Sequence, residues 1–201
     1  MIRNIIFDFG DVFINLDKAI IFKEIEKFGG TSKLSPKLQK ANNLFEVGRM
    51  TTADFIDTLK AVYPKASKQE IKTIWNAMLL DFPDYRLRFL EELAKEEKYS
   101  LFLLSNTNAL HIAHVRKIMG TKKYERFKNC FKRFYLSHEI NMRKPNTNIY
   151  EFVLAQNKLK AEETLFIDDT SENTEAASTL GIHCWNIQVG KEDIIQLKTK
   201  L

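Results

Sequence analysis

Polar residues follow several short apolar runs of the sequence, and their types suit the binding of a phosphate group and a metal ion. The apolar, β-branched run of residues 2–12 carries the chain to an aspartate, after which a glycine allows a sharp turn. Later apolar runs end in a serine, a lysine-containing loop and an aspartate pair. These residues are Asp8, Gly10, Ser105, Lys144 and Asp168–Asp169.

The carboxylates have two chemical uses. Asp8, with Asp168 or Asp169, supplies the hard oxygen ligands that Mg²⁺ prefers. Asp8 can also act as a nucleophile, because an aspartyl phosphate divides phosphoryl transfer into two easier steps. As isolated residues, however, Asp8 suits a turn and the aspartate pair suits the start of a helix.

The remaining candidates suit an anionic substrate. Ser105 and the neighbouring Asn106 are placed to bind a phosphate group, and Lys144 can neutralise charge on the phosphate and on a phosphorylated carboxylate. Ser105 alone would be a turn residue and Lys144 alone a solvated lysine. His111 and His114 lie one helical turn apart, but no third ligand is in register, so we interpret them as ordinary helix residues.

The elements that must position these residues alternate between strands and helices. Strands are expected near 100–104, 131–136, 164–167 and 182–185, separated by segments of helical periodicity, with a closing helix over 194–197. Such alternation predicts right-handed crossovers and a single parallel sheet. The fold class is therefore α/β, with a Rossmann-like parallel sheet flanked by helices.

A purely helical block interrupts this pattern after the first strand. Apolar residues recur at helical spacing from about Lys18 to Leu80, with start signals at Thr51 or Thr52 and at Ser67. We therefore predict an inserted helical bundle at residues 17–81, within a core formed by 1–16 and 82–201.

Composition favours a globular protein of the cytoplasm. The 201 residues are 44% hydrophobic and 28% charged, with no apolar run long enough to cross a bilayer and no cleavable signal pattern. Cys130 and Cys184 have no metal-ligand spacing and fit free thiols. The net charge of +5 includes a basic stretch over 117–133, which we interpret as a solvated helix face rather than a nucleic-acid site.

Taken in order, the motifs resemble the haloacid dehalogenase superfamily of hydrolases over nearly the whole chain. They are Asp8-Phe9-Gly10, Leu104-Ser105-Asn106, Arg143-Lys144-Pro145 and Ile167-Asp168-Asp169. The helical block resembles that family's small cap, and residues 45–51 are similar to a segment common there. The resemblance extends to the branch of sugar-phosphate phosphatases that act on substrates such as glucose 1-phosphate.

The resemblance implies a Mg²⁺-dependent phosphatase of a small phosphorylated metabolite. It makes Asp8 the nucleophile. Ser105 would donate a hydrogen bond to the phosphate, and Lys144 would stabilise its negative charge. Asp169 would be a direct metal ligand, with Asp168 as second ligand or water-holding partner. The Gly10 carbonyl would fill a further metal position, and Asn173 could steady the metal's waters.

The sequence departs from the family two residues after the nucleophile, where most of its phosphatases carry a second Asp as general acid and base. Here that residue is Gly10. We expect Asp11 to point to the opposite face of an extended segment, which leaves Asp17 or no residue in that role. Losing proton transfer costs about 10²–10⁴-fold and predicts a preference for good leaving groups. Asn141 replaces a common Gly and tolerates the left-handed conformation.

Two other functions stay open from the sequence. One is a metal-independent haloacid dehalogenase that uses Asp8 to attack carbon, which the pair Asp168–Asp169 disfavours. The other is a phosphate-binding protein without turnover, which Gly10 motivates. The surface of the helical block could support a homodimer, and the sequence leaves the oligomeric state open.

Overall fold

The computed structural model describes residues 1–31 and 34–201, and its centre is one parallel sheet. The sheet order is β3-β2-β1-β4-β5, and every pairing is parallel. The strands are β1 Asn4–Phe7, β2 Ser100–Ser105, β3 Arg133–Leu136, β4 Thr164–Asp168 and β5 His183–Asn186. The predicted α/β class with a Rossmann-like sheet is confirmed.

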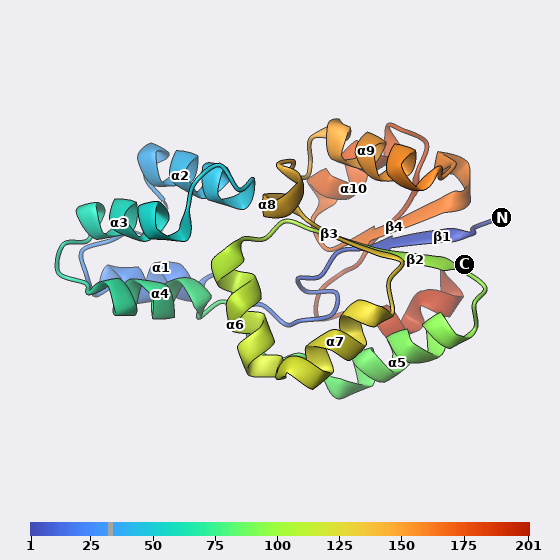
Figure 1. Ribbon diagram of the computed structural model, residues 1–201, viewed down its shortest axis with the longest axis horizontal. Coiled ribbons are helices and arrows are strands. Elements are labelled where there is room, and N and C mark those ends of the chain that lie inside the picture. Colours follow the sequence, from blue (N-terminus) through green and yellow to red (C-terminus); the bar gives the residue numbers. More distant parts are fainter. Residues whose placement is uncertain (32–33) are drawn as a thin grey trace.

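Helices cover both faces of this sheet (Figure 1). On one face lie α9 (Thr147–Asn157) and α10 (Ser171–Ser178), and on the other α5 (Asp84–Lys95) and α7 (Thr121–Asn129). Alternate strand residues enter the two layers: Ile5 and Phe7 join the cluster under α5 and α7, whereas Ile6 packs under α9 and α10. The central strands are therefore apolar on both sides, as a buried parallel sheet requires.

Four helices between β1 and α5 form a separate layer beside the sheet (Figure 1). They are α1 Ile20–Glu26, α2 Pro36–Glu46, α3 Thr52–Val62 and α4 Lys68–Asn76. Thr51 caps α3 as predicted, and Ser67 forms a capping box with Glu70 at α4. Their apolar faces form a cluster of their own, in which the rings of Phe45 and Phe55 stack at 4.3 Å. We refer to residues 17–81 as the helical insert.

Two chain segments join the insert to the sheet, and they run antiparallel beside each other. Leu16 forms a β-bridge with Leu79. The Asn15 N–H donates to the Asp81 carbonyl at 2.9 Å, and the Asp17 N–H donates to the Met78 carbonyl at 2.9 Å. The domain division at 16/17 and 81/82 stays a prediction, but the chain leaves and rejoins the sheet layer at this paired linker.

The structure differs from the sequence-based expectations in several short segments. The first strand ends at Phe7, and Asp11 adopts a left-handed conformation with φ 54°. Gly120 separates α6 (Ala109–Met119) from α7, and α8 (Ser137–Ile140) lies in the predicted loop before Lys144. The closing segment, Ile194–Thr199, is a 3₁₀ helix, as is the short turn Ala161–Glu163.

Part of the basic stretch lies on the surface of α7, where two of its side chains are paired. On α7, Lys123 pairs with Asp84, and Arg126 makes a two-point contact with Glu91 of α5. Cys130 and Cys184 are free thiols, as expected. Among the described residues, no helix has both the length and the apolar character needed to cross a membrane.

Candidate active site

The carboxyl ends of β1, β2 and β4 bring the predicted site residues to one edge of the sheet. Phe7 of β1 is in register with Leu103 of β2 and with Ile167 of β4. Asp8 is therefore level with Asp168, and the Asp8 N–H donates to the Ile167 carbonyl at 2.8 Å. Carboxylate oxygens of Asp8, Asp168 and Asp169 lie within 4.8 Å of one another. The predicted convergence of these carboxylates is therefore present in the structure.

Lys144 is buried at the centre of this cluster. Its Nζ lies 2.7 Å from Asp8 Oδ1 and 2.6 Å from Asp168 Oδ2, and the side chain is 1% exposed. The Phe166 ring lies beneath the ammonium, with its centroid 5.3 Å away. Burial alone would lower the pKa of Lys144, but pairing with Asp168 and Asp8 outweighs it and raises that pKa. Lys144 is therefore a fixed positive charge between two carboxylates.

The Lys144 loop is held by Asn106. The Asn106 side chain donates to the Lys144 carbonyl at 2.9 Å and accepts from the Lys144 N–H at 2.9 Å. Sequence reasoning placed Asn106 in substrate binding, whereas in the structure both ends of its amide position Lys144. Ser105 is buried beside it, and its hydroxyl makes no hydrogen bond within the part of the chain that the structure describes. That hydroxyl remains available to a phosphate oxygen.

The three carboxylates differ in how many of their oxygens are already used. Asp168 accepts from Lys144, from the Thr170 N–H at 2.9 Å and from the Asn173 amide at 3.0 and 3.1 Å. Asn173 therefore holds the Asp168 carboxylate, and its expected role toward the waters of a metal ion stays a prediction. Within the described residues Asp8 and Asp169 each keep one oxygen without a partner. Two carboxylates with free, hard oxygens fit a Mg²⁺ ion, and Asp168 fits the role of a holding residue.

The surroundings of Asp8 raise the pKa of its carboxyl group. Burial raises the pKa of Asp8 to about 7, against the opposing charge of Lys144 and with a further rise from Asp168. A nucleophilic carboxylate must be ionised, so a cation beside Asp8 would favour its reactive form.

The turn after Asp8 brings Leu16 close to Gly10, the position of the family's second aspartate. A Cβ at Gly10 would stand 2.7 Å from Leu16 Cδ1 and 3.8 Å from Asp8 Oδ2. A methyl group of the linker therefore lies beside the position from which an acidic side chain would face Asp8. Asp17 accepts hydrogen bonds from the N–H groups of Ala19 and Ile20, so its carboxylate starts α1.

Asp11 lies in a different local structure from the one that the sequence predicts, and whether it acts as an acid stays untested by this geometry. The segment is a tight turn, not an extended one: the Asp11 N–H donates to the Ile14 carbonyl, and Asp11 Oδ1 accepts from the Leu16 N–H at 3.0 Å. Its second oxygen lies 3.0 Å from Lys18 Nζ.

Sequence reasoning missed Lys18, which lies at the edge of the cluster. Lys18 Nζ is 2.6 Å from Asp169 Oδ2 as well as 3.0 Å from Asp11. A lysine outside every motif, at the start of a helical block, carries no sequence signal for this contact. Lys18 therefore brings the paired linker into electrostatic contact with a candidate metal ligand.

The insert reaches the Lys144 loop at a second place. Glu46 pairs with Arg143 at 2.9 Å, and the Asn141 amide donates to the Val47 carbonyl at 2.8 Å. Asn141 is left-handed with φ 57°, as its replacement of a glycine predicted. The segment 45–51 that the sequence singled out is thus the contact between α2 and the loop that carries Lys144.

His111 and His114 both lie on α6, as their helical spacing predicts. His111 is buried in α6 and its Nε2 lies 3.1 Å from the Trp75 carbonyl of α4, so it joins the insert to the core. Of the aromatic residues near the end of the insert, Trp75 and Phe82 are packed in apolar clusters, whereas Tyr85 is 41% exposed and donates to Asp193.

Known proteins resemble the chain along its whole length. A D-ribitol-5-phosphate phosphatase of Bacteroides thetaiotaomicron is 25% identical over 96% of this chain and 95% of its own. A haloacid dehalogenase family enzyme from the same organism, solved as a magnesium complex, is 34% identical with a TM-score of 0.83, over 95% of this chain and 96% of its own. The wild-type form of that enzyme was also solved with magnesium and inorganic phosphate (33% identity, TM-score 0.79, coverage 96% and 97%).

A predicted hydrolase of this type from Porphyromonas gingivalis is 29% identical, with a TM-score of 0.82 and coverage of 100% and 97%. The family model described as haloacid dehalogenase-like hydrolase matches residues 5–187, which include every motif residue named above. The resemblance seen in the sequence is confirmed: the chain belongs to the haloacid dehalogenase-like hydrolases.

Proposed function

We propose that this protein is a Mg²⁺-dependent phosphatase that hydrolyses a small phosphorylated metabolite through an aspartyl phosphate at Asp8. The observation that carries this proposal is the buried Asp8–Lys144–Asp168 arrangement with Asp169 beside it. The named phosphatase relative and the magnesium and phosphate complexes of a similar enzyme support the same enzyme class, a phosphoric monoester hydrolase.

The chain's own residues account for the chemical steps. The Asp8 carboxylate attacks phosphorus in line with the leaving oxygen, so that an Oδ–P bond forms while the bond from phosphorus to the leaving group breaks. Lys144, held by Asp168 and Asn106, stabilises negative charge on the phosphoryl oxygens, and Ser105 donates to one of them. Bound at Asp8 and Asp169, with the Gly10 carbonyl as a further ligand, Mg²⁺ would supply positive charge at the same oxygens.

Water then attacks phosphorus of the aspartyl phosphate, which regenerates Asp8 and releases inorganic phosphate. The leaving alcohol takes its proton from solvent, because residue 10 is a glycine and offers no acidic side chain. The reaction therefore favours leaving groups that depart without protonation. Sugar phosphates with an anomeric leaving group, such as a hexose 1-phosphate, meet this requirement. D-Ribitol 5-phosphate, the substrate in the name of one relative, has a poorer alkoxide leaving group, so we expect it to be hydrolysed more slowly than an anomeric phosphate. The insert would close over the site and select among them.

The experiment is hydrolysis of p-nitrophenyl phosphate with Mg²⁺ and with EDTA, using wild type, Asp8→Asn and the control Asp57→Asn. Asp57 lies on α3 and pairs with Lys68, away from the site. We expect Mg²⁺-dependent turnover that falls by about 10³-fold or more in Asp8→Asn and is unchanged in Asp57→Asn.

Two outcomes would replace this proposal. Turnover that survives EDTA, together with chloride release from 2-chloropropionate, would indicate a haloacid dehalogenase. Silence on every ester by a folded protein that still binds Mg²⁺ and phosphate would indicate a binding protein, which the Leu16 methyl beside Gly10 would explain.

A further inference from the structure

Lys18 is placed where a cation can change the charge of the candidate metal site without being a ligand. Its ammonium pairs with Asp169 at 2.6 Å and with Asp11 at 3.0 Å. The two carboxylates are nearly buried, with side chains 10% and 9% exposed, whereas the Lys18 side chain is 53% exposed. Lys18 thus reaches in from the surface to two partly desolvated acids.

The ion pairs around this site define its formal charge. Four carboxylates, Asp8, Asp11, Asp168 and Asp169, face two ammonium groups, Lys18 and Lys144. With all four carboxylates ionised, the formal charge is −2, which one divalent cation neutralises. Without Lys18 the charge would be −3, and the site would stay negative after one Mg²⁺ had bound. A negative site repels a phosphate anion, and the repulsion is strong where water is excluded.

The pairing of Lys18 is also electrostatically favoured. A lysine ammonium carries its charge at neutral pH, and both of its contacts here are with carboxylates. The lysine is therefore a permanent charge under ordinary conditions.

We propose that Lys18 is a positioning residue that balances the charge of the active site, weakening the site's affinity for Mg²⁺ and strengthening its affinity for the phosphate anion. It acts through Asp169 and Asp11, and the inference rests on the proposed phosphatase function of the same site. Because Lys18 follows the paired linker directly, the charge balance depends on where the linker holds the first residues of the insert.

The experiment measures two equilibrium constants in wild type, Lys18→Met and Lys18→Arg. The first is the dissociation constant of Mg²⁺ in the absence of phosphate, and the second is that of inorganic phosphate at saturating Mg²⁺, both by titration calorimetry. The matched control is Lys23→Met, since Lys23 is an exposed lysine of α1 that makes no ion pair within residues 1–31 and 34–201.

In Lys18→Met we expect Mg²⁺ to bind about fivefold more tightly and phosphate about fivefold more weakly, because a half-exposed ion pair has an effect of this size. Lys18→Arg keeps the charge and should keep both constants, as should Lys23→Met. Asp11→Asn removes a negative charge from the same pair and should shift both constants in the opposite direction. The effects should shrink in high salt.

Two constants that move in opposite directions support the inference, since a residue that only stabilises the linker would weaken both. Unchanged constants in Lys18→Met, or a parallel loss of both, would overturn it. The outcome is separable from the proposed function. If both dissociation constants stay unchanged in Lys18→Met while wild type hydrolyses p-nitrophenyl phosphate fully, only the role of Lys18 is refuted. If the two constants shift in opposite directions but wild type shows no turnover, only the phosphatase function is refuted.

Discussion

The sheet core and the helical insert bury their side chains in different ways. The core carries charged groups into its interior: Asp168 is 0% exposed and Lys144 1%, and each is held by several contacts. The insert packs an apolar cluster around Phe55, with buried polar atoms at Trp75 Nε1 and Asn76 Oδ1 that have no hydrogen-bond partner among the described residues. The core therefore surrounds paired charges with apolar packing, whereas the interior of the insert is an apolar cluster without an ion pair among the described residues.

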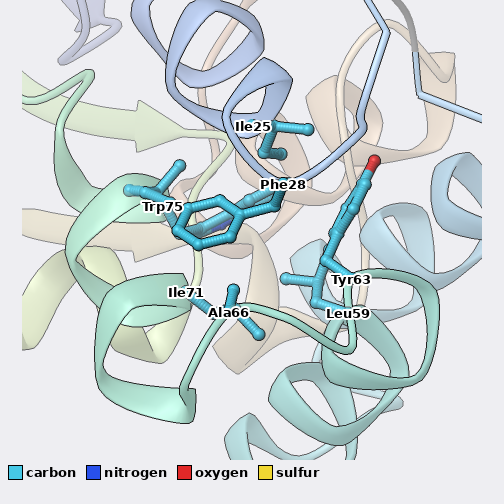
Figure 2. A pocket seen from close by; sticks show the side chains of 8 residues that line it. Ile25, Phe28, Leu59, Tyr63, Ala66, Ile71 and Trp75 are labelled. Atoms are coloured by element: carbon cyan, nitrogen blue, oxygen red, sulfur yellow. The ribbon is translucent and has the colours of Figure 1, made fainter.

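The insert also leaves a small apolar cavity. A space of about 10 Å³ lies among side chains from α1, α3 and α4, with Phe28 and Trp75 on one side and Leu59 and Tyr63 on the other (Figure 2). Its volume is about that needed for one water, but its lining is apolar. The cavity lies in the region that would select substrates, while the core must hold charges at fixed distances.

The largest expected effect is on the free energy of unfolding, which can be measured for the core and the insert separately. Leu59 of α3 and Leu103 of β2 are both fully buried, and replacing either with Ala costs about 2–5 kcal/mol of unfolding free energy. The chain has two tryptophans, Trp75 in the insert and Trp185 in the core, so variants keeping one of them report each region separately in urea. We expect Leu59→Ala to shift the Trp75 transition more than the Trp185 transition, and Leu103→Ala the reverse. Equal shifts at both tryptophans would show one cooperative unit.

The contact between the regions should be sensitive to acid. Burial lowers the pKa of His111 to about 4, against the opposing effect of its contact with the Trp75 carbonyl. The folded protein therefore holds a neutral imidazole, while the unfolded chain binds a proton near pH 6.5. Stability from this group is fully present above pH 6.5 and is lost as the pH falls toward 4, by roughly 3 kcal/mol in total.

This loss is measured as urea unfolding of the Trp75 signal at several pH values. His111→Asn should show a smaller dependence on pH between 6.5 and 4 than wild type. The control His183→Asn changes an exposed histidine of β5 and should keep the wild-type slope. An unchanged slope in His111→Asn would contradict the assignment.

A smaller effect tests the polar contacts of the core. Asn173 donates to both oxygens of Asp168, and removal of such a supporting residue typically costs about 10–100-fold in metal affinity. We expect Asn173→Ala to weaken Mg²⁺ binding by this factor in titration calorimetry. The matched variant Asn157→Ala removes an amide that contacts Tyr135 and should bind Mg²⁺ as wild type does. Equal Mg²⁺ affinities in the two variants would show that Asn173 does not support metal binding.

The smallest expected effect lies at the contact of α2 with the Lys144 loop. The Glu46 and Arg143 side chains are 20% and 30% exposed, so the pair is worth less than about 1 kcal/mol. Glu46→Gln should raise KM for a phosphate ester by up to about fivefold and leave kcat unchanged, because the insert and not the nucleophile is affected. Glu96→Gln, in an exposed pair with Lys198, should change neither constant. A fall in kcat would contradict this prediction, because it would show that Glu46 affects the chemical step.

Features with local causes could be predicted from the sequence. The four insert helices follow from apolar spacing and from caps such as Ser67, and the convergence of Asp8, Lys144 and Asp168 follows from parallel strands that share an edge. Ser105 was placed correctly at the end of β2 for the same reason.

Features that depend on distant contacts could not be predicted. Asp11 was expected on an extended segment, but hydrogen bonds to Ile14 and Leu16 close a turn and place it in the left-handed region. Lys18 finds Asp169, which lies 151 residues further along the chain. The contact of the Asn106 amide with the backbone of Lys144 joins residues 38 positions apart, and nothing near Asn106 in the sequence indicates it.

The paired linker has a consequence for how such a molecule can be altered. Because Leu16 and Leu79 are bridged side by side, the two ends of the insert are already adjacent in space. A segment with adjacent ends can be shortened, enlarged or exchanged without moving the strands that flank it, since the loop it closes keeps the same end points. The sheet and the edge that carries the site residues can thus accept inserts of different size. A short turn from Asn15 to Asp81 would give the smallest form of the protein, without an insert.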